Sequence, residues 1–201
     1  MKPSDRPQLV LASRSPRRRK LLIEAGFEYK VITPDVREVI SSEITLREAT
    51  SWNALRKGLA VARLRPNDIV LAADTLVALG SEILGKPANH AEAARILRLL
   101  SGRTHEVTTA VFVAHLRAGR TETFCVTSKV AFKNLTDRMI QDYLKRIDPL
   151  DKAGAYAAQG QGGTVISRIC GSRTNVIGLP LEKTRAALAR FGLRPKRRPI
   201  A

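Results

Sequence analysis

The most constraining feature of this sequence is an apolar run that ends at an acid. Residues Ile69 to Ala73 are all apolar, and Asp74 and Thr75 follow them directly. A short apolar run without polar alternation is typical of a strand that is buried on both faces. We therefore expect a central strand that ends at Asp74 and Thr75 and meets a polar site there.

Strand and helix signals alternate on both sides of this run. The other predicted strands cover residues 8–12, 27–31, 106–116, 123–132 and 164–169, and a hairpin is expected at 76–84. The predicted helices cover residues 17–25, 45–64, 89–100 and 136–146, and a last helix opens at Pro180. Antiparallel hairpins lie between the alternating ends, which predicts an α/β fold with a mixed, twisted central sheet flanked by helices.

Length and composition favour one compact globular unit. The chain has 201 residues, of which 44% are hydrophobic and 26% charged, and a domain usually takes about 150 residues. No repeat, low-complexity tract or linker divides it. We expect a domain over residues 8–192, followed by a basic tail over 193–201.

Signals for export, membrane insertion and metal-binding cysteines are missing from the sequence. The first apolar run, Leu9 to Ala12, is shorter than the core of a signal peptide, and no run approaches the ~18 apolar residues of a membrane span. Cys125 and Cys170 form no CxxC pair, which signals neither zinc nor a redox pair. These observations predict a cytoplasmic protein with reduced, buried thiols and no membrane partner.

Positive charge is concentrated in two stretches. Residues 14–20 and 194–198 hold nine basic residues and no acid, which leaves +8 of the formal +17 for the rest of the chain. The first stretch follows a predicted strand and opens a helix, where free N–H groups and the helix dipole favour a phosphate. The second is typical of a solvated tail, because its like charges repel.

Several common catalytic motifs fail when they are tested. The stretch from Gly80 to Pro87 nearly matches a phosphate-binding Walker A loop, but proline stands where that loop needs a Ser or Thr hydroxyl. The three histidines are isolated, with neither HExxH nor GxSxG. Zinc hydrolysis and a serine triad are therefore unsupported.

Six blocks, in order along the chain, resemble the successive motifs of the Maf family. They are Leu11–Arg18, Ala72–Val77, Leu84–Pro87, Leu100–Val107, Asp151–Tyr156 and Asn175–Pro180. The resemblance extends from Leu9 to Phe191. It implies a nucleoside triphosphate pyrophosphatase of the Maf fold, which cuts between the α- and β-phosphates, and a homodimer. The version of the fifth block that continues to Gln159 and Gly160 is similar to the branch that acts on dTTP and UTP.

The resemblance also implies roles for individual residues. Asp74 matches the catalytic acid, assigned as proton acceptor, and Glu38 with Asp74 matches carboxylates for a divalent metal, Mg²⁺ or Mn²⁺. The positions matched to substrate specificity are Arg17, Thr75 and Gln159. The positions matched to the surroundings of the phosphates are Ser13, Arg18, Lys57 and Lys86. The chemistry agrees, since a triphosphate needs several cations and a hard metal needs carboxylate oxygens.

Four places depart from the usual pattern of the family. Gly58 stands where alanine is usual, and Trp52-Asn53 is an unusual pair in its helix. Ala157-Ala158 replaces the usual pair before Gln159, and Arg173-Thr174 is unusual before Asn175. None of them alters the proposed catalytic acid.

One alternative belongs to a different class of protein. A net charge of +17 would suit a nucleic-acid-binding or cell-division-regulating protein of the same fold that has lost catalysis. Aromatic residues are only 4% of the chain, which argues against stacking on single strands, and no duplex-recognition motif is present. We expect a nucleoside triphosphate rather than nucleic acid as the partner.

Overall fold

One mixed sheet organises the chain in the computed structural model, which describes residues 6–41 and 43–196. Its strands are β1 (Leu9–Ala12), β2 (Lys30–Val31), β3 (Ile69–Leu79), β4 (Glu82–Leu84), β5 (Thr104–His115), β6 (Arg120–Phe132) and β7 (Ile166–Cys170). The order is β2-β1-β3-β5-β6-β7, and β4 pairs with β3. β1 is parallel to β2 and β3, and the other pairs are antiparallel.

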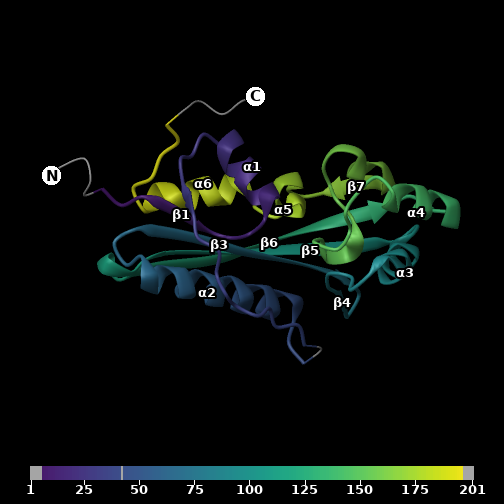
Figure 1. The fold of residues 1–201 in the computed structure, drawn as a ribbon, viewed down its shortest axis with the longest axis horizontal. Coiled ribbons are helices and arrows are strands. Elements are labelled where there is room, and N and C mark those ends of the chain that lie inside the picture. The colour runs from purple at the N-terminus through teal and green to yellow at the C-terminus, as the bar shows by residue number, and fades with distance from the viewer. Residues whose placement is uncertain (1–5, 42, 197–201) are drawn as a thin grey trace.

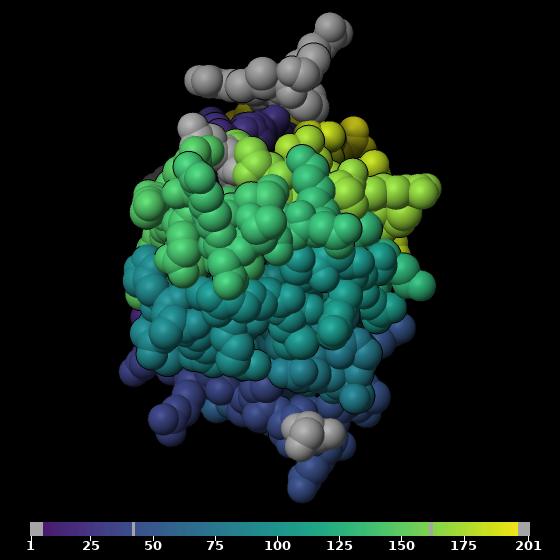
Figure 2. All heavy atoms as spheres, turned by 90° about the vertical axis from the view of Figure 1, so that its right-hand side faces the viewer, coloured from purple at the N-terminus to yellow at the C-terminus, as the bar shows by residue number. Residues whose placement is uncertain are grey.

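Helices cover both faces and one end of the sheet. They are α1 (Pro16–Glu24), α2 (Leu46–Leu64), α3 (His90–Leu100), α4 (Asp137–Leu144), α5 (Arg173–Ile177) and α6 (Leu181–Arg190). The long helix α2 lies on one face, and α1, α5 and α6 lie on the other (Figure 1). The teal residues of α3 and the green residues of α4 and the segment after it close one end (Figure 2). The predicted α/β class and the mixed sheet are therefore confirmed.

Strand alternation sorts the core into two layers. Leu9 and Leu11 pack with α1 and α6, whereas Val10 and Ala12 pack with α2. The same period continues along β3, because successive side chains of a strand point to opposite faces. Asp74 therefore faces α2, and its neighbour Thr75 faces α1.

The central strand does not end where the sequence predicted. β3 continues from Ile69 through Asp74 to Leu79, because β5 pairs with it along nearly its whole length. On the other side of β3 the pairing is broken. β1 leaves after the pair Ala12–Ala72, and β4 begins at the pair Val77–Leu84. Asp74 thus lies beside a gap in the sheet, which gives it the access that we had expected from a strand end.

Other predicted elements differ in extent. The strand expected at residues 27–31 is reduced to Lys30–Val31, and the one expected at 164–169 begins only at Ile166, after a 3₁₀ turn. The short helix α5 was not predicted. It begins after Ser172, whose side chain accepts a hydrogen bond from the Asn175 N–H.

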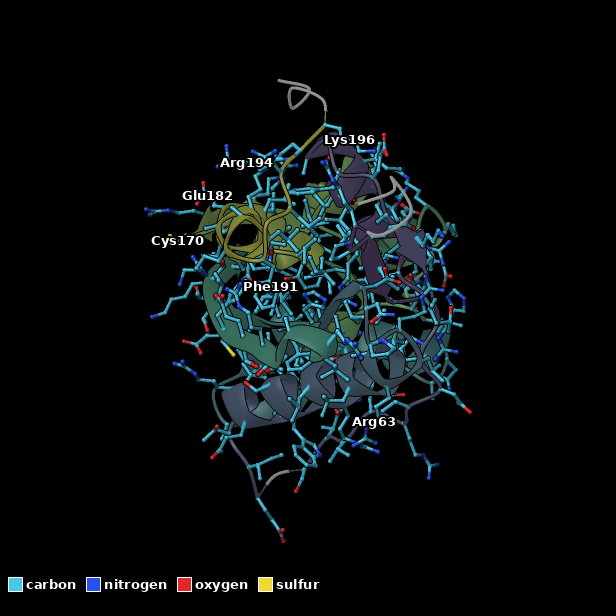
Figure 3. The ribbon with its side chains drawn as sticks, turned by 90° about the vertical axis from the view of Figure 1, so that its left-hand side faces the viewer. Arg63, Cys170, Glu182, Phe191, Arg194 and Lys196 are labelled. Atoms are coloured by element: carbon cyan, nitrogen blue, oxygen red, sulfur yellow. The ribbon has the colours of Figure 1, made fainter. Side chains whose placement is uncertain are left out.

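The prediction of two buried thiols is wrong. Cys125 is half-buried on β6, with its Sγ 3.1 Å from Ser51 Oγ. Cys170, at the end of β7, is exposed (Figure 3). It is the last residue of β7, the strand at the edge of the sheet, and no further strand of the described residues pairs with β7 on its other side. Within the described residues, no helix is both long and apolar enough to span a bilayer.

The first residues of the basic tail pack on the domain. Leu193 contacts the core between the sheet and α1 and α6. The Lys196 N–H donates to the Gly26 carbonyl at 3.0 Å, near the surface position that Figure 3 labels. Residues 197–201 of the predicted tail lie outside the described residues. The boundary of the domain at residue 192 stays a prediction.

Gly58, one of the departures from the family pattern, has a steric reason. It lies on α2 against β5, and a Cβ at this position would meet Phe112 Cδ1 at 2.1 Å and Ala72 Cβ at 3.2 Å. The absence of a side chain lets α2 approach the sheet closely.

We expect Gly58→Ala to destabilise the protein by about 1–2 kcal/mol. Overpacking a core costs about 1–3 kcal/mol, while alanine recovers about 0.5–1 kcal/mol of helix propensity. Urea unfolding of Gly58→Ala, Phe112→Leu and the double variant would measure the coupling between the sites. The double variant should be more stable than the sum of the two single effects predicts. A Gly58→Ala protein as stable as wild type would contradict the close packing.

Candidate active site

The turn between β1 and α1 is shaped by its own serines. Ser15 caps α1, and its side chain accepts from the Arg18 N–H at 3.5 Å, while Pro16 occupies the first turn. Ser13 Oγ accepts from the Ser15 N–H at 3.1 Å and from Arg18 Nη1 at 3.3 Å. These bonds fix the turn at the N-terminus of α1, which lies at the gap beside β3.

A cavity of about 420 Å³ lies at this gap. Eight of the nine predicted site residues line it: Ser13, Arg17, Arg18, Glu38, Lys57, Asp74, Thr75 and Lys86. Gln159 is the ninth. It follows Ala158, which lines the cavity, but Gln159 itself is not part of the lining. The fold thus brings together side chains from five separate segments of the sequence.

One buried ammonium group joins the two carboxylates. Lys57 Nζ lies 2.5 Å from Asp74 Oδ1 and 2.6 Å from Glu38 Oε1. Lys86 Nζ pairs with the other oxygen of Glu38 at 2.7 Å. Asp74 is 3% exposed and Lys57 8%, so water screens their ion pair poorly. Lys57, which sequence alone leaves on a helix surface, is therefore an internal group of the site.

The two lysines keep Glu38 ionised. Burial alone would raise its pKa, but the charges and hydrogen bonds of Lys57 and Lys86 outweigh burial and lower the pKa of Glu38 to about 2. The site therefore holds this carboxylate as an anion at any physiological pH.

Thr75 and Arg18 form a second polar group, on the α1 side of the sheet. Arg18 Nη2 donates to Thr75 Oγ1 at 3.0 Å, and Arg18 Nε donates to the Gly178 carbonyl at 2.7 Å. Thr75 Oγ1 in turn lies 2.9 Å from Thr109 Oγ1. Burial lowers the pKa of Arg18, although the charge of Asp74 opposes this effect. Arg18 therefore ties α1 to β3 and to the end of α5 while it faces the cavity.

Arg17 reaches across the mouth of the cavity. Its Nη1 lies 2.8 Å from Asp151 Oδ2, and its Nη2 donates to the Asp151 carbonyl at 3.3 Å. Burial opposes ionisation of Asp151, but Lys152 and Arg17 together lower its pKa. The sequence pointed to the block that contains Asp151 and Lys152, yet assigned neither of them a role.

An aromatic cluster supports the wall formed by residues 151–158. Tyr156 lines the cavity, and its hydroxyl lies 2.8 Å from Nε2 of His105, which is 1% exposed. Phe132 packs edge-on against both rings. The Tyr143 hydroxyl accepts from the Ala157 N–H at 3.1 Å. The cavity wall is thus anchored to β5 and α4.

The sequence did not reveal Asn53 as part of the site. It is fully buried on α2, and its Nδ2 lies 3.3 Å from Asp74 Oδ2. Sequence analysis noted it only as unusual. A stronger signal was available, since Asn53 stands four residues before Lys57, the spacing that places two side chains on one helix face.

The residues fit a metal that is shared with a substrate better than a closed metal site. Among the described residues, no group of three or more His, Cys, Asp or Glu side chains could hold an ion. Glu38 and Asp74 supply two carboxylates, which lie close together because both pair with Lys57. Magnesium is commonly held by one or two carboxylates together with phosphate oxygens, and this donor set matches that pattern.

Burial of His105 should make stability depend on pH. Burial lowers its pKa from the usual 6.5 to about 4, so between these values the unfolded chain binds the extra proton. The free energy of unfolding should therefore fall as pH drops from 6.5 to 4, by at most about 1.4 kcal/mol per pH unit from this group. Urea unfolding across this range would show the slope. His105→Gln, which keeps a polar group beside Tyr156, should remove that component, whereas parallel curves for the two proteins would contradict it.

Comparison with known proteins shows the family of this chain. The family model described as "Maf-like protein" matches residues 8–191. A dTTP/UTP pyrophosphatase of Bacillus pumilus is 43% identical over 188 residues, which cover 94% of this chain and 98% of the relative. One of Anaeromyxobacter dehalogenans is 46% identical over 188 residues, covering 92% and 95%. Among solved structures, the Staphylococcus aureus Ham1 protein is 18% identical with a TM-score of 0.49, covering 91% and 98%. The chain belongs to the Maf family.

Proposed function

We propose that this chain is a nucleoside triphosphate pyrophosphatase that hydrolyses dTTP and UTP to the monophosphate and pyrophosphate. Two relatives that bear this name share 43% and 46% of their residues with it over nearly the whole chain. The observation that carries the proposal is the cavity itself, which Asp74 lines together with Lys57, Lys86 and two arginines. This is the charge arrangement that hydrolysis of a polyanionic anhydride requires.

Asp74 acts as the base in this proposal. Its carboxylate is held in one orientation, with Oδ1 on Lys57 and Oδ2 near Asn53. An ionised carboxylate at the cavity wall can orient a water molecule and accept its proton as the oxygen attacks phosphorus. Both oxygens have a donor, but the contact of Asn53 with Oδ2 is longer, at 3.3 Å against 2.5 Å for Lys57 and Oδ1. Oδ2 can accept a second hydrogen bond, so it is the oxygen we assign to the water.

The remaining cations hold the triphosphate and its leaving group. Among the described residues, Arg17 pairs with Asp151 at the mouth of the cavity, and it can exchange this carboxylate for phosphate oxygens in a bidentate contact. Lys86, half-exposed beside Glu38, can exchange its carboxylate for a phosphate oxygen as a single positive charge. Positive charge at these positions would stabilise the pyrophosphate as the anhydride bond breaks.

Glu38 and Asp74 would hold a divalent metal together with phosphate oxygens. When it is bound, such an ion neutralises charge on the triphosphate and polarises its phosphoryl oxygens. The low pKa of Glu38, about 2, keeps this ligand ionised and ready.

Thr75 and Gln159 are proposed to select the base. A carboxamide offers both a donor and an acceptor, so Gln159 can pair with the imide edge of uracil or thymine. Its neighbour Ala158 lines the cavity, which keeps Gln159 close to the space where a base would sit.

From membership of the family alone, we further propose that the protein works in the cytoplasm as a homodimer.

The alternative of nucleic-acid binding rests on the net charge of +17. Part of this charge is not offered to an outer surface, because Arg17 and Arg18 are turned into the cavity and bound there. Their charge serves a concave site for a small anion and not a continuous outer surface.

Asp74→Asn should abolish most of the turnover of dTTP while the fold and triphosphate binding are retained. The amide has the same shape but lacks basicity, and loss of a general base typically lowers the rate about 10²–10⁴-fold. Phosphate release from dTTP and UTP, with Mg²⁺ and added inorganic pyrophosphatase, measures this effect, with CTP and the purine triphosphates as slower substrates. Asp142→Asn, which changes an exposed carboxylate on α4, is the matched control. More than a tenth of the wild-type rate in Asp74→Asn would contradict the role of Asp74.

A further inference from the structure

Asn53 connects the proposed base to the segment that carries Glu38. Residues 32–41 form neither helix nor strand, so no sheet or helix holds the backbone around Glu38. Asn53 Oδ1 accepts from the Val39 N–H at 2.8 Å, and Asn53 Nδ2 donates to the Val39 carbonyl at 2.9 Å. One side chain thus satisfies both backbone groups of a single loop residue, as a neighbouring strand would.

The second N–H of the same amide points to Asp74. Asn53 Nδ2 lies 3.3 Å from Asp74 Oδ2, while Lys57 Nζ lies 2.5 Å from Asp74 Oδ1. Each oxygen of the carboxylate therefore has its own donor, and the two donors come from positions one helical turn apart on α2. Two donors on different oxygens prevent the carboxylate from rotating, whereas one would not.

The contacts follow a single stripe of α2. Asn53, Arg56 and Lys57 have the i, i+3, i+4 spacing that puts side chains on one face. Arg56 Nη1 donates to the Arg37 carbonyl at 3.0 Å, and Lys57 pairs with Glu38. The helix therefore binds three consecutive residues of the loop, 37–39, through these side chains. Within this stripe, Asn53 and Lys57 also contact Asp74.

We propose that Asn53 is a positioning residue for hydrolysis, which aligns the Asp74 carboxylate and fixes the Glu38 segment against it. This inference rests on the proposed function. Asn53 is fully buried and outside the cavity lining, so its position gives it no contact with a nucleotide in the cavity. Its loss should act on the chemical step, and substrate binding should change little.

The test compares Asn53→Leu with Asn53→Asp in steady-state hydrolysis of dTTP. Leucine has a similar volume but makes none of the three hydrogen bonds. We expect kcat to fall about tenfold or more, since a misplaced catalytic group is costly, with KM changed less than about threefold. Aspartate keeps an acceptor for the Val39 N–H but faces Asp74 with a second anion, so its kcat should be no higher than that of Asn53→Leu.

Thr50→Val is the matched control on the same helix. Thr50 is fully buried, and its hydroxyl donates to the Leu46 carbonyl within α2 and not to a backbone group of the loop. It should keep wild-type kcat and KM. Amide hydrogen exchange of residues 33–41 should accelerate in Asn53→Leu and stay unchanged in Thr50→Val. This measurement tests whether Asn53 holds the loop in place, and it does not depend on turnover.

The outcomes separate this inference from the proposed function. If the wild-type protein hydrolyses dTTP and a folded Asn53→Leu or Asn53→Asp variant keeps a kcat within threefold of the wild-type value, the role of Asn53 alone is overturned. A rise in KM at unchanged kcat would also overturn it, because Asn53 would then act on binding. Wild-type protein that releases no pyrophosphate from any nucleoside triphosphate would overturn the proposed function and the role of Asn53 together.

Discussion

The site depends on one buried ammonium group that is shared by two carboxylates. Lys57 pairs with both Asp74 and Glu38 at 2.5–2.6 Å, in surroundings where an unpaired charge would be costly. Asp74 could not be buried here without Lys57, and Lys57 could not be buried without a carboxylate partner, while Glu38 is only half-buried. The ion pairs therefore connect β3, α2 and the irregular segment after β2. Lys86 and Arg17 pair with the more exposed carboxylates of Glu38 and Asp151, so they can exchange these partners for a ligand.

The sheet supplies the space for this arrangement. β1 ends and β4 begins on the same side of β3 with a gap between them, and Asp74 and Thr75 lie beside the gap. Their side chains point to opposite faces of the sheet, so the two residues recruit different partners: Lys57 and Asn53 from α2 for Asp74, and Arg18 from α1 for Thr75. The proposed catalytic group and the proposed specificity position are thus neighbours in sequence and still have separate hydrogen-bond networks.

Local signals in the sequence predicted elements whose ends are determined by local chemistry. The capping box of Thr45 and Glu48 forms both of its hydrogen bonds and starts α2, as expected. Features that depend on distant partners were missed. β3 passes Asp74 because β5 pairs with it, and Asn53 belongs to the site because Val39 and Asp74 meet it in space. The motif residues were found through family resemblance, whereas Asn53 required the three-dimensional contacts.

Hydrolysis of dTTP in ¹⁸O-labelled water tests the account most directly. If Asp74 directs water to the α-phosphorus, and the cations of Arg17 and Lys86 stabilise the departing pyrophosphate, the bond between the α-phosphorus and its bridging oxygen breaks. Mass spectrometry of the products, without added inorganic pyrophosphatase, should then find one ¹⁸O atom in dTMP and none in pyrophosphate. Label in the pyrophosphate, or release of inorganic phosphate as the first product, would contradict the account.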